Sequence, residues 1–551
     1  MKRYDENELY RTILEMVRIP SVTTAPGGED TVSDYIVDSL MCEEYFKAHP
    51  ENVRKVRMEG DPLGRSFVFA VVRAKAETAR TVLLTGHMDV VDTAAYGPLA
   101  PWAFDPEKLP PRLADIPLPD DARADLDSGE WLFGRGVADM KGGLAAGLVL
   151  LKHLSRARDV EANVALFAVP DEENNSLGML SASTYLAQQA GPQPSEGAAY
   201  VACVDLEPTF PGGPEAEPTI YLGTVGKINA FFYCRGSETH LGEYYEGFSA
   251  SRVLSRINLI LEGNPRYSDR IAGRIFVPYV AVRQTDLRDE YSSTPMTKGF
   301  SFYGHLTVAQ MPSDVLSDMS EVAREALRQS IADHEKNTAA FVQGGGKPAH
   351  RVWRPTVLTY EEAVRRARER LGEAAFHTLL ERTYGEAAGS DERAAAMRIV
   401  EAVSCACDFP RPFVVVGFLP PWYPHRLNRG RTAGERAMQA AAERLSETAA
   451  SRFGRRVRIS PVFEGVSDLS YCGFQGEPGE IRAFAENMPG WPATYSLPVE
   501  AQTTLDIPIL NFGPVGKDAH KNTERIHLPY ALEVYPHLLR ALVETLADSG
   551  P

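Results

Sequence analysis

Residues 81–89 read TVLLTGHMD, an almost unbroken apolar run that leads into a histidine and an aspartate. Such a run is typical of a strand buried on both faces of a sheet. Two further stretches repeat the plan: NVALFAVPDEE (163–173) ends in acids, and AYVACVDLEPT (199–209) ends in Glu-Pro-Thr. Open α/β sheets bind ligands at the carboxyl ends of their strands. The sequence therefore predicts an α/β domain whose site collects polar side chains at one sheet edge.

Helical patterns alternate with these strands, which favours a largely parallel sheet. A glycine-rich loop, GRGVADMKGG (134–143), leads into one such helix, and a Pro-rich loop is expected over about 93–128. After the Pro/Gly-rich linker 210–218, the pattern changes to a long alternating strand (219–236) and several helices, including two extra segments near 360–405. We expect a catalytic domain in two parts, 1–216 and 425–551, and an inserted α+β domain over 217–424.

The composition narrows the class of function. The chain has 551 residues, is 44% hydrophobic and carries a formal net charge of -16, so nucleic acid and anionic membranes are not expected partners. The N-terminus has no signal-peptide pattern, and no apolar run approaches the ~20 residues of a membrane span. The six cysteines include only a C-x-C pair at 405 and 407, which favours free thiols in a reducing compartment. The expected location is the cytoplasm.

Two groups of residues carry potential metal ligands, one at a strand end and one in a loop. His87 and Asp89 are two apart in a strand and face the same way, so Asp89 can hold the second ring nitrogen of a metal-bound His87. A surface histidine beside a carboxylate is the alternative. Asp139 projects from the glycine-rich loop, and its two carboxylate oxygens could bridge two metal ions. An ordinary helix N-cap is the alternative there.

Adjacent acids follow the apolar run that starts at residue 163. Adjacent acids at a buried strand end are costly unless a cation neutralises them, and neighbouring residues point to opposite sides. Of Glu172 and Glu173, one could bind metal and the other could transfer protons; a solvated acidic turn is the alternative. Glu207 and His520 follow further strands. Together these histidines and carboxylates match the ligands of zinc and similar divalent ions.

The motifs HMDVVD, GRGVADMKGG, DEE, EPT and GPVGKDAH occur in an order that resembles the metallopeptidase family of aminoacylase, glutamate carboxypeptidase, acetylornithine deacetylase and succinyl-diaminopimelate desuccinylase. IPSV (19–22) and SDLSY (467–471) also fit this family. FLPPWYPHRLN (418–428) and the extra helices resemble the branch of the arginine-utilisation protein RocB. The resemblance implies a zinc-exopeptidase-like, mainly parallel sheet flanked by helices, with an inserted α+β dimerisation (lid) domain.

The resemblance also implies roles for single residues. Two divalent ions, zinc or else manganese or cobalt, would be bridged by Asp139 and otherwise held by His87 with Glu207 and by Glu173 with His520. Asp89 would orient His87, and Glu172 would be the general base. His240, in RGSETHLGEYYEGFSA (235–250), would reach the active site of a partner chain and stabilise the oxyanion, which implies a homodimer. Asp205, two residues before Glu207, could be the ligand in its place.

The expected function is metal-dependent hydrolysis of an amide bond in a dipeptide or an N-acyl amino acid, with a link to arginine or ornithine metabolism. Exopeptidase and deacylase remain open. A catalytically silent metal-binding dimer is disfavoured by the retained Glu172, and an aminopeptidase of related fold by the insertion that carries His240. Arg283 and Arg288 could hold a substrate carboxylate or be surface arginines. The extra helices could narrow the pocket or extend the dimer contact.

Overall fold

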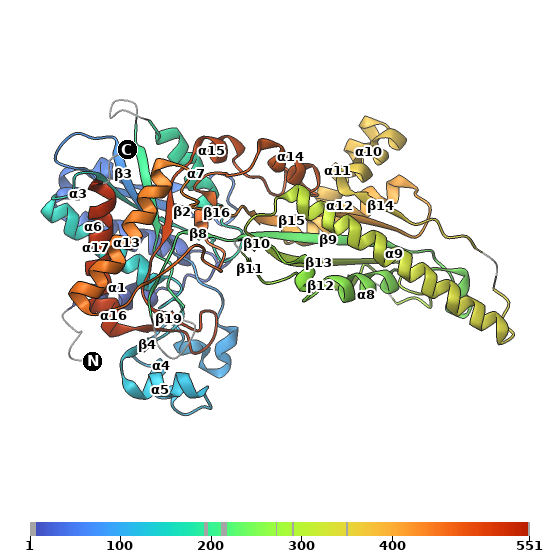
Figure 1. Ribbon diagram of the computed structural model, residues 1–551, viewed down its shortest axis with the longest axis horizontal. Coiled ribbons are helices and arrows are strands. Elements are labelled where there is room, and N and C mark those ends of the chain that lie inside the picture. Colours follow the sequence, from blue (N-terminus) through green and yellow to red (C-terminus); the bar gives the residue numbers. More distant parts are fainter. Residues whose placement is uncertain are drawn as a thin grey trace. The chain divides into compact units, whose positions relative to one another are not determined.

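The computed structural model describes residues 7–191, 197–210, 217–271, 273–288, 291–348 and 351–548 (Figure 1). The chain forms two compact units: the first comprises Met1–Val225, Arg426–Phe474 and Pro498–Pro551, and the second comprises Gly226–His425 and Gln475–Leu497. The second unit thus includes a segment near residue 485 that the sequence interpretation assigned to the catalytic part.

An eight-stranded sheet forms the centre of the first unit, in the order β1-β2-β5-β3-β6-β18-β7-β17. Its strands are β1 (Val53–Arg57), β2 (Ser66–Val72), β3 (Arg80–His87), β5 (Asn163–Val169), β6 (Ala199–Asp205), β7 (Thr219–Tyr221), β17 (Arg458–Ser460) and β18 (Ile509–Asn511). The central strands β5, β3, β6 and β18 run parallel. β3 is buried from Thr81 onward, which explains its continuous apolar sequence. The mainly parallel sheet that the sequence predicts is confirmed.

Helices cover both faces of this sheet. Val82 and Leu84 of β3 join one hydrophobic core with α1 (Glu8–Val17), α2 (Gly28–Met41), α6 (Lys141–Ala157), α13 (Ala433–Phe453) and α17 (Tyr535–Asp548). On the opposite face, Tyr185 of α7 (Leu177–Gln189) packs against Phe67 and Phe69 of β2. Each fully buried aliphatic or aromatic side chain contributes roughly 1.5–3 kcal/mol, so this double cover fixes the strand ends in place.

A three-stranded sheet, β19-β20-β4, connects two loops of the first unit. It comprises β4 (Trp131–Phe133), β19 (Gly516–Lys517) and β20 (Arg525–His527). The pairing of β4 with β20 brings the loop after residue 133 to the loop before residue 525. The expected Pro-rich loop is partly helical: η2 (Ala94–Trp102), α4 (Leu109–Leu113) and α5 (Asp120–Ser128) surround a small core that includes Tyr96 and Phe133.

The second unit contains a five-stranded sheet in the order β12-β13-β9-β15-β14. The strands are β9 (Gly226–Arg235), β12 (Val280–Asp286), β13 (Lys298–Thr307), β14 (Thr356–Thr359) and β15 (Phe413–Tyr423). Phe231 and Tyr233 of β9 pack against α10 (Tyr360–Leu371), α11 (Glu373–Ala387) and α12 (Glu392–Cys407). On the other face, Tyr303 donates a hydrogen bond to Asn258 of α8 (Ala250–Leu261), which packs against the long helix α9 (Pro312–Gln343).

Smaller elements complete the described chain. They are α3 (Glu44–Ala48), η1 (Pro50–Asn52), β8 (Gly223–Thr224), η3 (Leu241–Glu246), η4 (Pro265–Tyr267), β10 (Arg270–Ile271), β11 (Arg274–Ile275), β16 (Arg426–Leu427), η5 (Asp468–Tyr471), α14 (Pro478–Glu486), α15 (Val499–Thr504) and α16 (Leu528–Glu533). Among the helices of the described ranges, none combines the length and the apolar character needed to cross a membrane.

Candidate metal centre

His87 ends strand β3 and faces two acids from other elements. Its Nε2 lies 3.1 Å from Asp139 Oδ1 and 3.2 Å from Glu207 Oε1. Its Nδ1 lies 2.9 Å from the backbone oxygen of Asp89, which can only accept a hydrogen bond, so Nδ1 carries the proton. Nε2 is therefore the ring nitrogen that faces the carboxylates, on the side where a metal ion would bind.

The second histidine approaches the same aspartate from the other side. His520 Nε2 lies 3.2 Å from Asp139 Oδ2 and 3.0 Å from Glu173 Oε1. One oxygen of Asp139 thus faces each histidine. His87, Asp139 and Glu173 offer ligand atoms that all lie within 4.8 Å of one another. The side chain of Glu173 is 8% exposed, which argues against a solvated acidic turn.

The loop that carries Asp139 is held by residues that the sequence interpretation did not single out. Glu524 accepts hydrogen bonds from the backbone N–H groups of Ala138 and Asp139, both at 3.2 Å. Arg135 donates to Glu524 at 2.6 Å and to the backbone oxygen of His520 at 3.1 Å. The helix that follows starts only at Lys141 with Met140 as its cap, so Asp139 is not an N-cap.

Glycine at position 143 allows this loop to approach strand β6. A Cβ atom there would lie 2.0 Å from the backbone oxygen of Leu206, the neighbour of Glu207. Any larger residue would push the start of α6 away from the acid. The glycines of GRGVADMKGG therefore serve close packing at this position, beyond loop flexibility.

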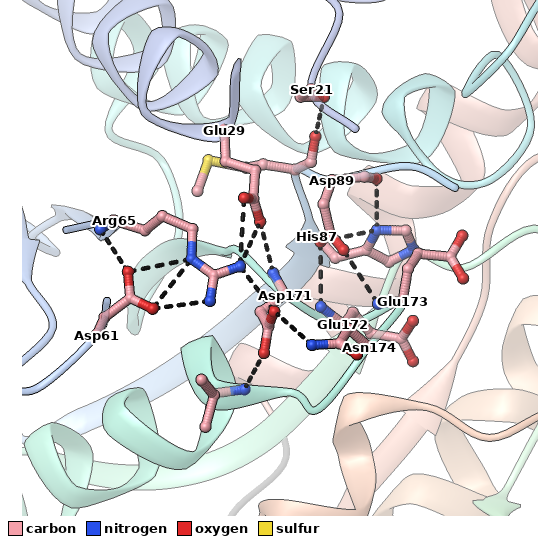
Figure 2. Close-up of polar contacts among 12 residues, drawn as sticks. Ser21, Glu29, Asp61, Arg65, His87, Asp89, Asp171, Glu172, Glu173 and Asn174 are labelled. Carbon is pink, nitrogen blue, oxygen red and sulfur yellow. Dashed lines mark hydrogen bonds and ion pairs between the residues drawn. The ribbon is translucent and has the colours of Figure 1, made fainter. Parts of the chain in front are cut away.

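Asp89 has a second contact besides His87 (Figure 2). Its carboxylate accepts the backbone N–H groups of Glu172 at 3.1 Å and Glu173 at 3.0 Å. Its Oδ1 is also 3.5 Å from His87 Nδ1. Ser21 of the IPSV segment donates to the backbone oxygen of Met88 at 2.7 Å, which anchors this strand end. Asp89 therefore connects the histidine to the turn that carries both glutamates.

The electrostatics of the cluster favour an added cation. Burial raises the pKa of Glu172 and Glu207 well above the usual range, and neighbouring carboxylates raise both further. Burial alone would lower the pKa of His87, but its bonds to Asp139, Asp89 and Glu207 raise it well above normal. Burial would likewise raise the pKa of Asp139, but both histidines lower it. Carboxylates crowded together in this way are stabilised by a divalent ion.

The donor set fits such ions. Imidazole nitrogen and carboxylate oxygen are standard zinc ligands at about 2.0–2.2 Å, so two ligand atoms on one tetrahedral ion lie roughly 3.4 Å apart. The separations of 3.0–3.2 Å between the two histidine nitrogens and the oxygens of Asp139, Glu173 and Glu207 are close to this value. The residues could therefore hold two ions that share the Asp139 carboxylate.

Other candidate residues lie elsewhere. Asp205 is the last residue of β6, two residues before Glu207; it pairs with Thr85 and Asn511 across the sheet and is buried. His240 lies in the second unit, is exposed, and accepts a hydrogen bond from the Gly242 N–H at 3.2 Å. Arg283 is exposed on β12, while Arg288 donates to Thr294 Oγ1 at 2.5 Å within its own loop.

The extra helices of the second unit line a hollow of about 640 Å³. Its walls come from α10, α11 and the segment 485–491, and they include Phe376 and Trp491. None of the residues proposed for catalysis lines it. The candidate site is therefore identified by its cluster of histidines and carboxylates, and not by this hollow.

Comparisons with known proteins agree with a metal-binding site in this chain. The sequence profile of peptidase family M20/M25/M40 matches residues 83–478. The chain is 34% identical over 546 residues to the uncharacterized protein YqjN of Bacillus subtilis (strain 168), covering 98% of this chain and 96% of that one. It is 27% identical over 527 residues to Protein RocB of the same organism, covering 95% and 92%. An M20 family metallo-carboxypeptidase, Sso-CP2 from Sulfolobus solfataricus, shares the fold, with TM-score 0.51, 13% identity and 98% and 99% coverage.

Proposed function

The chain belongs to peptidase family M20/M25/M40 and is a metallohydrolase, and we propose that it cleaves an amide bond in a dipeptide or an N-acyl amino acid. The observation that carries this proposal is the division of the Asp139 carboxylate between His87 at 3.1 Å and His520 at 3.2 Å. A carboxylate shared in this way suits two divalent ions, of which zinc matches the nitrogen and oxygen donors. Manganese and cobalt suit the same ligands.

We assign His87 and Glu207 to one ion, and Glu173 and His520 to the other. Glu207 is preferred over Asp205 because its oxygen lies 3.2 Å from His87 Nε2. Two divalent ions held there would polarise the amide carbonyl and make a water molecule more acidic. Glu172 takes the proton of that water and later returns it to the leaving amine. Asp89 fixes Glu172 by accepting its backbone N–H at 3.1 Å.

Metal removal tests the proposal. We expect the chelated protein to lose hydrolysis of a panel of N-acetyl and N-succinyl amino acids and dipeptides, and zinc, manganese or cobalt to restore it. The panel includes arginine and ornithine derivatives because of the resemblance to RocB. Added metal should also raise the melting temperature by several degrees, since an ion at about 1,000 times its Kd contributes about 4 kcal/mol. Metal binding without turnover on any substrate would instead support the silent binding protein.

We further propose a homodimer formed through the second unit. β12 is an edge strand that, within the described ranges, pairs only with β13. Val280 and Val282 on it are 49% and 59% exposed, and Leu259 on α8 is 76% exposed. An unpaired strand edge with exposed apolar side chains is suited to pairing with a second copy of the chain.

Mixing inactive variants tests whether His240 acts across this dimer. We expect His240→Ala and Glu172→Gln to be inactive alone and active after mixing and re-assembly, because a mixed dimer holds one site with both residues intact. The restored activity should approach about a quarter of wild type, since about half of the dimers are mixed. Absence of restored activity in confirmed mixed dimers would show that His240 does not serve the partner's site.

A further inference from the structure

The turn that delivers Glu172 and Glu173 begins at a residue in an unfavourable conformation. Asp171 has φ of 71°, in the left-handed region. This region costs roughly 1–2 kcal/mol for most residues other than glycine, although aspartate tolerates it better than most. The backbone N–H of Ser176 donates to the backbone oxygen of Asp171 at 2.7 Å, which closes the turn. Further contacts must hold Asp171 if the two glutamates are to keep their directions.

Arg65, in the loop directly before β2, supplies such a contact (Figure 2). Its Nη1 donates to Asp171 Oδ1 at 2.6 Å, while its Nη2 donates to Asp61 Oδ1 at 2.8 Å. The side chains of Arg65, Asp61 and Asp171 are at most 5% exposed. The guanidinium is therefore fixed by one carboxylate and holds a second.

Glu29 of α2 contacts both Asp171 and Arg65. It accepts the backbone N–H of Asp171 at 2.9 Å, and its carboxylate lies 3.3 Å from Arg65 Nη1. Asp171 is thus restrained at both its backbone and its side chain. On the other side of the turn, Asp89 accepts the N–H groups of the next two residues. The turn is held between Arg65 with Glu29 and the aspartate that contacts His87.

We propose that Arg65 is a positioning residue for the hydrolytic reaction, which acts through Asp171 to set the directions of Glu172 and Glu173. The proposal rests on the function proposed above for those glutamates. A lysine cannot replace the arginine, because one ammonium group cannot match the fork that contacts Asp61 and Asp171 together. Residues that orient metal ligands typically change metal affinity or activity by about 10–100-fold when mutated.

Cobalt provides a readout that does not depend on turnover. We expect Arg65→Lys to lower Co²⁺ affinity and kcat by about 10–100-fold each, to change the visible absorption of bound Co²⁺, and to alter KM less than about threefold. In Arg65→Ala, millimolar guanidinium chloride should restore part of kcat and the wild-type spectrum. Asp61→Asn, a milder change that leaves the Arg65–Asp171 pair, should give an intermediate effect.

Arg426→Lys is the matched control. Arg426 is 1% exposed in the same unit and pairs with Asp506 at 2.7 Å, but it does not contact the turn. Its variant should lose stability without a change in the Co²⁺ spectrum. If Arg65→Lys behaves as this control does, with only its melting temperature lowered, the positioning role is wrong. If the wild type hydrolyses nothing but Arg65→Lys still changes the spectrum, the proposed function fails, while the part of the proposal in which Arg65 sets the directions of Glu172 and Glu173 stands.

Discussion

Glu172→Gln is expected to lower kcat by about 10³-fold while the protein keeps its full content of metal, since proton transfer by a positioned side chain contributes about 10²–10⁴-fold. Glutamine keeps the size of the side chain and its backbone bond to Asp89, but it cannot accept the proton of the attacking water. The loss corresponds to about 4 kcal/mol of transition-state stabilisation. KM should change little, because no substrate contact is removed.

Metal analysis and steady-state kinetics on the same preparation check this prediction. Glu161→Gln, an exposed glutamate of the first unit, is the matched control and should retain wild-type kcat. A Glu172→Gln enzyme with full metal content and more than a third of the wild-type kcat would exclude Glu172 as the general base. The reaction would then need another proton acceptor at the sheet edge.

Local sequence pattern predicts much of the fold. The apolar runs before His87, Asp171 and Glu207 become the central strands β3, β5 and β6, because a strand buried on both faces leaves no room for polar alternation. The expected strand over 219–236 instead becomes β7, β8 and β9, with the chain passing between the two units at residue 225. Its alternation continues across the breaks, so periodicity alone does not reveal them.

The motifs predict which residues gather at the centre, but not what supports them. Arg135, Glu524 and Arg65 form buried ion pairs whose partners lie up to 389 residues apart in the sequence. A single buried arginine has no periodic signal, and its partner is defined only by the three-dimensional fold. Asp89 shows the same limit. Strand spacing predicts its carboxylate beside His87, but β3 ends at His87, and the backbone oxygen of Asp89, at 2.9 Å, lies nearer to Nδ1 than its carboxylate, at 3.5 Å. The bonds of that carboxylate to the Glu172 and Glu173 amides depend on how β5 ends.

Asp139→Asn is expected to weaken both metal sites at once, by at least about 100-fold each, whereas His520→Ala should mainly weaken one. The reason is that Oδ1 of Asp139 faces His87 and Oδ2 faces His520, so a neutral amide removes an anionic donor from both sides. The imidazole of His520 pairs with Asp139 and Glu173, on one side of the cluster.

Metal content after gel filtration, together with Co²⁺ titration, separates these outcomes. The wild type should bind about two ions per chain, His520→Ala about one tightly, and Asp139→Asn none tightly, as follows from a shared carboxylate. His87→Ala is the matched counterpart of His520→Ala and should weaken the other site. If Asp139→Asn kept one tight ion, the carboxylate would serve a single metal, and the two histidines would belong to sites that bind independently.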